Sequence, residues 1–460
     1  MKKGLIAIIL FMFAVPAVFG TIITNTNQSV MYIRLPARNA SMLIDAVYYN
    51  PAGVVHLKNG FHLAIHNQSI WQDKTVINEF PLLNKDDSTL FDGPSYVGEV
   101  RVPIFPSFFA VYKKDKLAIS FGFGPNSGGG TADFATGLPS FEIPVSLLPG
   151  LISAPPSLGG LGIPTNAYSV EMAFKGKSVF YGFQGNISYA ISDVFSVAAG
   201  ARYIYAVTEY DGELKNIQID PQYPPVNPSL GMMSAEQFFS AVYPPLVPRV
   251  ADIALDVKQT GSAITPLLGL NIRPNDSLNI GIRYELKTNL EMTNETTVDG
   301  SGLFPDGDTF RNDIPAILSL GIEYAIAPQF RIMVSYNLFF DENADWDGDE
   351  EFVDSNSYDI GVGFEFDITD SILISAGYLR TKVGVTEDYQ SDFTHELNSS
   401  AFGFGGRIML TPNISLDVGG LFVSYTDAEK SMQIPEYPLA FIEIYQRTSF
   451  DFSIGFGFRL

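Results

Sequence analysis

The side chains that could carry metal chemistry gather in one acidic segment, residues 341–354, which holds eight carboxylates and no Lys or Arg. Part of it follows the spacing of a calcium-binding loop, in which oxygen ligands recur at alternate early positions and at position 12, with Gly at position 6. The matching residues are Asn343, Asp345, Asp347, Asp349 and Asp354, with Gly348 at the glycine position. Because position 1 is Asn, position 12 is Asp and strand patterns flank the segment, two interpretations fit: a structural calcium ion, or a solvated acidic loop without a metal.

Groups suited to catalysis are sparse. The chain has no Cys, which excludes thiol catalysis, thiolate metal sites and disulfide frameworks. His62 and His66 share one face of a predicted strand, where residues four apart lie roughly 13 Å from each other, too far to bind one metal. No Gly-x-Ser-x-Gly segment occurs. We therefore expect a protein that is not an enzyme and has no cofactor, and the net charge of −22 argues against nucleic acid as a partner.

The elements that would position these residues have the period of a β-strand. In residues 450–460 every second position is apolar, and Asp, Ser, Gly and Arg lie between; residues 358–368 and 278–286 show a similar split. The predicted strands are longer than the five or six residues usual in globular proteins. A tilted strand needs about 9–11 residues to cross the hydrocarbon layer. This length favours a membrane barrel over a soluble sandwich.

Short and long connections alternate along the chain. The short connections fall near residues 113–116, 192–193, 274–277, 327–328, 369–370 and 411–413. Counting the long ones between them gives fourteen strands, at 60–72, 98–113, 116–124, 178–191, 194–211, 262–273, 277–291, 311–326, 329–340, 355–368, 371–382, 398–410, 414–426 and 447–460. An even number of strands closes a barrel without a free edge. The predicted fold is all-β, a closed 14-stranded antiparallel transmembrane β-barrel in a bacterial outer membrane.

The chain divides into three parts. Residues 1–20 are predicted to be a signal peptide, because Lys2 and Lys3 precede an apolar stretch and small residues end it. Residues 60–460 would form the barrel. Residues 21–59 are too few for a separate domain and are mildly apolar. Since a fourteen-stranded barrel is too wide for its own side chains to fill, we expect this segment to plug the lumen.

The predicted plug contains a distinctive string of residues. Tyr48 and Tyr49 precede Asn50, Pro51, Ala52 and Gly53, and the string resembles the signature of the FadL/TodX family. The resemblance implies a monomeric outer-membrane transporter of long-chain fatty acids and other hydrophobic compounds, with fourteen strands and an N-terminal hatch. From the residues themselves we expect a chain reversal here, because Pro51 fixes one φ and Gly53 permits a positive φ.

The predicted third strand runs into a segment rich in glycine. It includes Gly122, Gly124, Pro125 and Gly128. Proline cannot donate a ladder hydrogen bond, and glycine weakens strand pairing. By the family resemblance, this segment would shape a lateral exit into the membrane. The alternative is the ordinary start of an extracellular loop.

Two long connections are unusually apolar. Residues 141–163 carry one charge, that of Glu142, and residues 234–243 have the pattern of a short helix. Candidate residues for a groove that receives an apolar ligand are Phe141, Leu147, Leu148, Leu151, Phe238 and Phe239. Apolar loops of this kind either face a ligand or pack against one another, and both interpretations fit.

The expected partners are hydrophobic small molecules and membrane lipid. The expected function is passive uptake of long-chain fatty acids or similar molecules through a hatch-gated barrel with a lateral exit. A general diffusion porin and a structural or adhesive barrel are the alternatives. A carboxylate ligand would require a cation, for which the candidates are Arg34, Arg38, Arg202, Arg283, Lys287, Arg331 and Arg407.

Overall fold

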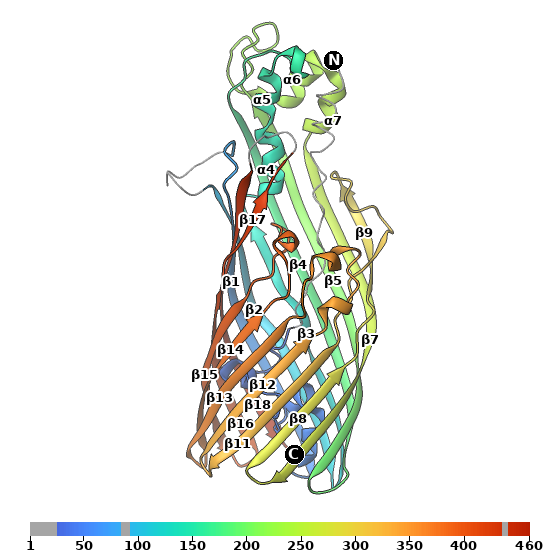
Figure 1. Ribbon diagram of the computed structural model, residues 1–460, viewed down its shortest axis with the longest axis vertical. Coiled ribbons are helices and arrows are strands. Elements are labelled where there is room, and N and C mark those ends of the chain that lie inside the picture. The colour runs from blue at the N-terminus through green and yellow to red at the C-terminus, as the bar shows by residue number, and fades with distance from the viewer. Residues whose placement is uncertain (1–24, 84–92, 435–439) are drawn as a thin grey trace.

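The computed structural model describes residues 25–83, 93–434 and 440–460, whose strands form one antiparallel barrel (Figure 1). The predicted signal peptide lies outside the described residues. The strands are β1 (Gly60–Asn78), β2 (Ser95–Lys114), β3 (Leu117–Phe134), β4 (Tyr168–Ala190), β5 (Phe195–Ile219), β6 (Met233–Ser234), β7 (Ile253–Asn275), β8 (Leu278–Glu285), β9 (Glu291–Asp299), β10 (Thr309–Arg311), β11 (Ile317–Ala327), β12 (Phe330–Phe339), β13 (Tyr358–Thr369), β14 (Ile372–Lys382), β15 (Ser399–Thr411), β16 (Ile414–Tyr425), β17 (Ala428–Met432) and β18 (Phe441–Arg459).

These segments make fourteen wall strands, as predicted. β8 and β9 are two parts of one wall strand, as are β10 and β11, while β17 continues β16 and β6 is a two-residue addition beside β5. The first and last wall strands pair along their length, from His62 opposite Arg459 to Asn78 opposite Glu443. That pairing closes the barrel, so no sheet edge is left to hydrocarbon.

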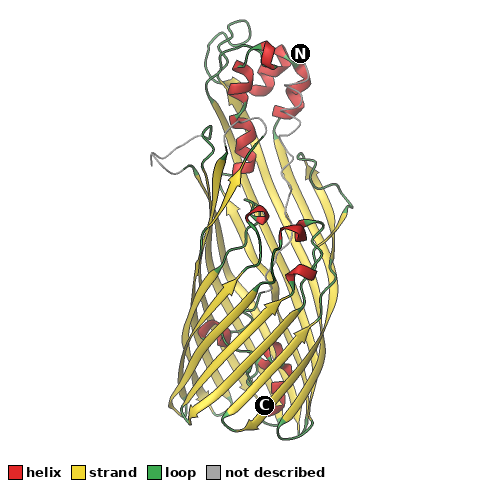
Figure 2. Cartoon of the chain, in the orientation of Figure 1, coloured by secondary structure: helices red, strands yellow, loops and turns green. Residues whose placement is uncertain are grey.

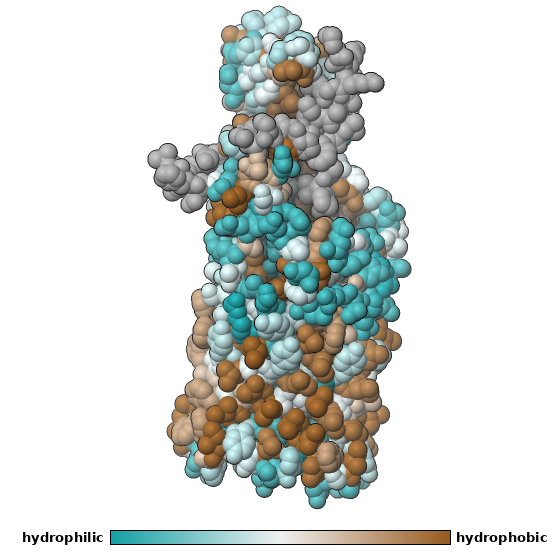
Figure 3. All heavy atoms as spheres, viewed as in Figure 1, coloured by the Kyte–Doolittle hydropathy of each residue, from teal (hydrophilic) through white to brown (hydrophobic). Residues whose placement is uncertain are grey.

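The predicted alternation places apolar side chains outside and polar side chains inside. On β13, Ile360 and Phe364 are 48% and 42% exposed, whereas Asp359 and Glu365 are 2% and 3% exposed. Tyr189, Tyr324 and Phe366 also face outward, each shortly before a short turn, where an aromatic girdle belongs. On the face seen in Figure 3, a belt of hydrophobic residues covers the lower barrel, and hydrophilic residues predominate above it.

The six short turns occur where the alternation predicted them, but several strands continue further at their other ends. β3 extends to Phe134, and β4, β5 and β7 rise well above the apolar belt (Figure 1). Helices cap these extensions (Figure 2). They are α4 (Pro139–Ser146), α5 (Leu148–Ser153), α6 (Ala235–Val242) and α7 (Val247–Val250), with one-turn helices η2 (Pro156–Leu158) and η3 (Pro244–Leu246). The predicted helix in 234–243 is confirmed as α6.

The remaining helices lie inside the barrel or in its outer loops. Within the barrel are α2 (Val30–Arg34), α3 (Ala46–Tyr49) and the 3₁₀ helix η1 (Pro51–His56). The outer loops hold η4 (Asp341–Asn343), η5 (Asp349–Phe352) and η6 (Glu387–Tyr389). Within the described residues no helix has the length and apolar character that crossing a membrane requires.

Candidate functional site

Residues 25–59, called the plug below, lie against the inner wall of the lower barrel (Figure 1). Its apolar side chains form a core with inward-facing wall residues: Val30, Ile33 and Val47 are fully buried, and Ala64 and Val111 on the wall pack against the same cluster. The segment that was too apolar to remain in water is thus buried by the barrel, as the sequence predicted.

The Asn50-Pro51-Ala52-Gly53 string joins the plug to three wall strands. Asn50 is completely buried, and its amide donates to the carbonyl of Ser41 at 3.0 Å and to Oδ1 of Asn271 on β7 at 2.7 Å. Ser188 on β4 and Ser196 on β5 donate to the carbonyls of Pro51 and Ala52. These wall side chains satisfy backbone groups that have left regular structure.

Gly53 serves a different purpose from the one predicted. It is not among the glycines with positive φ. Instead, a Cβ at this position would lie 2.6 Å from the carbonyl oxygen of Ser41 and 2.5 Å from the amide nitrogen of Asn50. Close packing, rather than a left-handed backbone, therefore accounts for the glycine.

The last helix of the plug, η1, ends at His56. Its Nε2 lies 3.2 Å from the amide nitrogen of Asn271. Burial, with the positive charges of Arg273 and Lys113 nearby, lowers the pKa of His56 to about 4. The imidazole is therefore neutral at pH 7, when it can accept that hydrogen bond.

Polar groups also hold the plug from the side. Arg34 lies 2.8 Å from Glu365 on β13 and 3.3 Å from Asp417 on β16, and all three side chains are buried. The ring of Tyr48 contacts two wall guanidinium groups, whose carbons lie 4.7 Å (Arg202) and 4.6 Å (Arg283) from the ring centroid. A buried cation that loses its carboxylate is strongly destabilising, so these contacts fix the plug in one position.

The glycine-rich segment of β3 interrupts the wall. Pairing between β2 and β3 runs from Lys114 to Phe108, stops, and resumes where Val100 faces Ala132. Pairing with β4 continues, with irregularities at Pro125 and at Gly128, whose φ is +69°. Here a Cβ would lie 2.0 Å from the carbonyl oxygen of Ser178, so the bend requires glycine. β3 therefore continues past the residue where the sequence suggested a loop, and it does so as a bent strand.

The plug supplies partners for the bent strand. The backbone amide of Asn25 donates to the carbonyl of Asn126 at 2.8 Å, and its side-chain amide donates to that of Gly128 at 2.9 Å. The side-chain amide of Gln28 donates to the carbonyl of Pro125 at 2.6 Å. A Cβ on Gly124 would lie 2.3 Å from Gln28, and one on Gly122 would lie 3.1 Å from Val47. The two glycines let the plug approach the wall closely.

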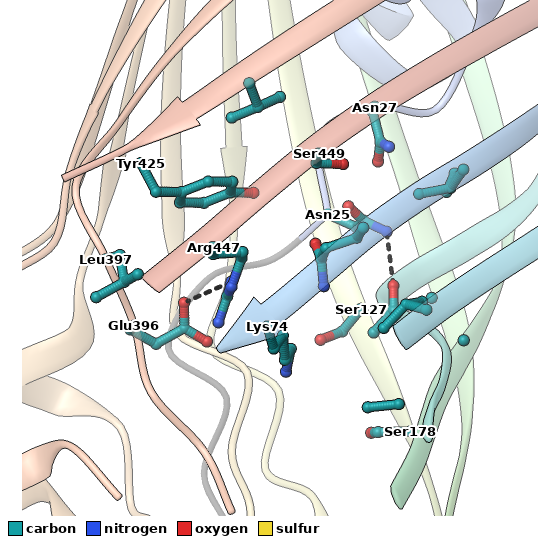
Figure 4. Close-up of a pocket in the computed structure, with 18 of the residues that line it drawn as sticks. Asn25, Asn27, Lys74, Ser127, Ser178, Glu396, Leu397, Tyr425, Arg447 and Ser449 are labelled. Carbon is teal, nitrogen blue, oxygen red and sulfur yellow. Dashed lines mark hydrogen bonds and ion pairs between the residues drawn. The ribbon is translucent and has the colours of Figure 1, made fainter. Parts of the chain in front are cut away.

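A cavity of about 360 Å³ lies in the lumen above the plug. Its wall includes plug residues 25–27, the bent segment 127–130 of β3 and inward-facing residues of β1 and β18 (Figure 4). Its aromatic side comprises Phe134, Phe174, Tyr210 and Phe393. The volume falls within the range of small-molecule sites, and the cavity reaches the interruption of the wall.

Most candidate residues of the apolar loops do not line the cavity but pack against other loop residues. Leu148, Phe238 and Phe239 are buried in the core of the helical cap, against which Leu151 also packs. Leu147 packs with another small cluster. Mutual packing, the alternative interpretation, therefore describes these five residues in this conformation.

Phe141 also packs against the core of the helical cap, but it has a second environment as well. It lines a small apolar depression at the mouth together with Leu255, Phe304 and Phe393. Phe393 also lines the lumen cavity. Its ring lies 5.9 Å from that of Phe141 and 5.1 Å from that of Phe174, both in edge-to-face arrangements. Phe393 could not be found from the sequence, because its loop carries no apolar run.

Each of the seven cations considered for a carboxylate ligand lies within 4.0 Å of a carboxylate of the protein, and Arg202 and Arg283 share one. The pairs are Arg34 with Glu365, Arg38 with Asp45, Arg202 and Arg283 with Glu285, Lys287 with Asp313, Arg331 with Asp367, and Arg407 with Asp417. Two further cations, Lys74 and Arg447, were not among these candidates, and both line the lumen cavity. Their place in the alternation is a signal that could have found them, since both fall on inward-facing positions.

The acidic segment uses its carboxylates separately. Glu350 accepts hydrogen bonds from the backbone amides of Trp346 and Gly348, and Asp345 lies 3.8 Å from Arg311. Across the part of the chain that the structure describes, no three His, Asp or Glu side chains are placed together to hold a metal ion. Calcium binding through Asn343, Asp345, Asp347, Asp349 and Asp354 stays a prediction that this arrangement does not support.

Comparisons with known proteins are consistent with this architecture. No family model matches the chain, and no curated protein matches it in sequence. Among solved structures, a Pseudomonas aeruginosa FadL homologue superposes with a TM-score of 0.64 at 13% identity, over 96% of this chain and 100% of that one. The toluene transporter TodX of P. putida gives 0.59 at 11% identity, over 91% and 94%. The toluene transporter TbuX of Ralstonia pickettii gives 0.57 at 12%, over 97% and 100%. This chain therefore has the fold of the FadL homologue and of the toluene transporters TodX and TbuX, as its resemblance to the FadL/TodX family led us to expect.

Proposed function

We propose that this protein admits hydrophobic molecules across a bacterial outer membrane, by passive diffusion through the lumen cavity and out through the interrupted wall. One observation carries the proposal: the cavity above the plug reaches residues 127–130, where β3 has lost its pairing with β2. A molecule there would meet an opening in the wall rather than a continuous ladder. The FadL homologue and the toluene transporters with the same fold support this function.

We propose that the plug acts as the hatch. It contacts the bent segment through Asn25 and Gln28, so a displacement of its first residues would remove partners from carbonyls beside the opening. Ligand would enter from the apolar depression at the mouth, pass Phe393, and occupy the cavity. The buried ion pairs of Arg34 hold the remainder of the plug in place, which favours local movement over loss of the whole segment.

A reversible disulfide across the opening, called the staple below, tests the lateral route. A Cβ on Gly130 would lie 3.9 Å from the Cβ of Val102, which suits a disulfide. The chain has no native Cys, so the double variant Val102→Cys/Gly130→Cys carries a single pair. We expect oxidation to reduce uptake of the fluorescent apolar probe N-phenyl-1-naphthylamine by roughly tenfold or more, and reduction to restore it.

The matched control staples an intact part of the wall. A Cβ on Gly457 would lie 4.0 Å from the Cβ of Ser415, its partner across β16 and β18. Oxidised Ser415→Cys/Gly457→Cys should transport like the wild type. Full uptake through the oxidised Val102–Gly130 staple would exclude the lateral route. Large steady ionic currents through the wild-type protein would favour the porin alternative instead.

A further inference from the structure

The loop between β14 and β15 crosses the interior of the barrel. β14 is the eleventh of the fourteen wall strands and β4 is the fourth, so the two lie on opposite sides of the barrel. Nevertheless, the ring of Phe393 in this loop lies 5.1 Å from that of Phe174 on β4. The Asp392 carboxylate accepts a hydrogen bond of 2.9 Å from the backbone amide of Ser140 in α4. Residues 390–396, called the inner loop below, therefore reach from one side of the lumen to the other.

The inner loop lies between two spaces of the proposed route. Among the residues that the structure describes, Phe393 alone lines both the depression at the mouth and the lumen cavity. Glu396, at the other end of the inner loop, lines the cavity beside Leu397 (Figure 4). A ligand that moves from the depression to the cavity therefore passes this loop.

The inner loop is held together mainly by its own hydrogen bonds. The side-chain amide of Gln390 donates to the carbonyl of Glu396 and accepts from its backbone amide, both at 2.9 Å. In the described part of the chain, the bond from Ser140 to Asp392 is the one hydrogen bond between residues 391–394 and a residue outside the inner loop. The tip can therefore leave the far side of the lumen as a unit when that contact weakens.

Two buried carboxylates lie here, one in the inner loop and one beside it. Asp392 is 4% exposed, and Glu443, which precedes the predicted spanning segment 447–460 of β18, is 3% exposed. Their hydrogen-bond donors are neutral: a backbone amide for Asp392, and the Asn78 amide and Tyr445 hydroxyl, each at 2.5 Å, for Glu443. Neutral donors compensate a buried negative charge less well than a cation does. Ionisation of both carboxyl groups in the closed loop is therefore unfavourable.

Negative charge predominates around this pair. Burial and the nearby charge of Asp392 raise the pKa of Glu443 to about 7, and burial raises the pKa of Asp392 as well. Lys430 on β17, the register partner of Glu443, directs its ammonium to the carbonyls of Asp388 and Gln390 at 2.9 and 2.7 Å. The other titratable groups that face the pair are Tyr96 on β2, Glu142 in α4, Tyr445 on β18, and Glu387 and Asp388 in the loop itself. Below about pH 7 the closed loop therefore holds a proton on one of the two carboxylates.

We propose that the inner loop is a gate between the mouth and the lumen cavity, held closed by Asp392 while the Asp392–Glu443 pair keeps one proton, and opened when that proton passes to water. This inference rests on the proposed function and adds its regulation. Loss of the proton leaves two like charges in a buried site, which is unfavourable. Withdrawal of the tip from α4 moves Asp392 toward water and separates the two charges.

The raised pKa sets the direction of the response. A solvated carboxyl group loses its proton near pH 4, so the stabilisation of the closed loop by the retained proton is complete below that pH. It is lost as the pH rises through about 7, the pKa of Glu443 in the closed loop. Between these two values the open population should grow by roughly tenfold per pH unit, and it should level off above about pH 7.

Hydrogen exchange of residues 387–398 measures the opening directly. It is followed by mass spectrometry on the purified, detergent-solubilised full-length protein and corrected for the intrinsic pH dependence of amides. In the wild type, exchange should accelerate by roughly tenfold per pH unit between about pH 5 and pH 7. Asp392→Asn should leave the corrected exchange nearly constant, because its amide cannot ionise. Glu443→Gln should end the acceleration at a lower pH, because Asp392 then lacks a neighbouring negative charge.

The matched control is Asp388→Asn, which removes an exposed carboxylate of the same loop and should keep the acceleration. Uptake of N-phenyl-1-naphthylamine by bacterial cells that express the full chain shows whether the inner loop controls the route. The ratio of wild-type uptake to Asp392→Asn uptake at the same pH cancels effects of pH on the probe and on the membrane. We expect this ratio to rise by roughly tenfold or more between about pH 5 and pH 7.

The outcomes separate this inference from the proposed function. Exchange in the wild type that does not depend on pH, or that depends on it equally in Asp392→Asn, would overturn the role of the proton. An inner loop that opens with rising pH while the uptake ratio stays constant would overturn the gate and leave apolar uptake standing. If no probe is taken up at any pH, the proposed function fails and the gate fails with it, whereas exchange alone decides whether the loop moves with pH.

Discussion

The side-chain amide of Gln28 donates a hydrogen bond of 2.6 Å to the carbonyl oxygen of Pro125, and it thereby joins the plug to the strand that interrupts the wall. The same nitrogen also donates to the carbonyl of Asn25 at 2.9 Å. Because Pro125 lies in the segment of β3 that has no partner on β2, the position of the plug and the shape of the opening are linked through this contact.

We expect Gln28→Leu to free the first residues of the plug. A buried carbonyl that loses its donor costs roughly 1–3 kcal/mol, which would raise the population of the displaced state about 5- to 150-fold. Single-channel recordings in planar bilayers should show more frequent brief openings. Gln72→Leu, at the same cavity but on β1, is the control, and identical recordings for the two variants would contradict the link.

Gly53→Ala should destabilise the plug. The added methyl group would lie 2.6 Å from the carbonyl oxygen of Ser41, and overpacking of this kind costs about 1–3 kcal/mol. The protein should therefore lose its compact gel mobility at a lower temperature than the wild type. Gly150→Ala is the matched control, since a Cβ there has no atom within 4 Å and the residue is helical. This control should be neutral or slightly stabilising, and a neutral Gly53→Ala would refute the close-packing explanation.

Phe393→Ala should weaken capture of apolar ligand. Phe393 contributes to both the depression at the mouth and the lumen cavity, so its loss would remove apolar surface along the whole proposed route. Aromatic pairs contribute about 0.5–1.5 kcal/mol beyond area burial, and two such pairs are lost. We expect oleyl alcohol to bind roughly tenfold more weakly in equilibrium dialysis. Phe402→Ala, on the lipid-facing side of β15 and 52% exposed, should bind it normally.

The loop that follows β12 should become less stable as the pH rises. Burial raises the pKa of Asp341 to about 7, although its Oδ2 accepts a hydrogen bond from the backbone amide of Ser357 at 2.8 Å. The folded loop therefore holds a proton that the unfolded chain releases near pH 4. The stabilisation of the loop by this bound proton is complete below about pH 4. It is lost as the pH rises through about 7, the pKa of Asp341 in the folded loop.

Hydrogen exchange of the Ser357 amide measures this effect. Exchange, corrected for the intrinsic pH dependence of amides, should accelerate between about pH 4 and pH 7, the ordinary pKa of the carboxyl and its pKa in the folded loop, and level off above that range. Asp341→Asn should abolish that acceleration, because its amide cannot ionise. Asp347→Asn changes an exposed carboxylate of the same loop. This variant should keep the pH-dependent acceleration of exchange. An unchanged profile in Asp341→Asn would show that another group titrates.

The sequence by itself determined the wall. Alternation of apolar and polar residues in segments such as 358–368 requires a sheet with one apolar face and one polar face. The turn residues at 113–116 and the five other short connections set the number of strands. The plug followed from its apolar composition, since burial inside the barrel removes its apolar side chains from water. Those inferences need only local patterns and the cost of exposing apolar surface.

The tertiary structure decided which residues face one another. Phe238 and Phe141 both lie in unusually apolar connections of the sequence. Packing of the helical cap nevertheless buries Phe238, whereas Phe141 lines the depression at the mouth. Arg34 was a candidate ligand from the sequence and Arg447 was not, yet the fold gives Arg34 two buried carboxylates and places Arg447 in the lumen opposite Lys74. Contacts between residues hundreds of positions apart depend on barrel closure, which no local pattern encodes.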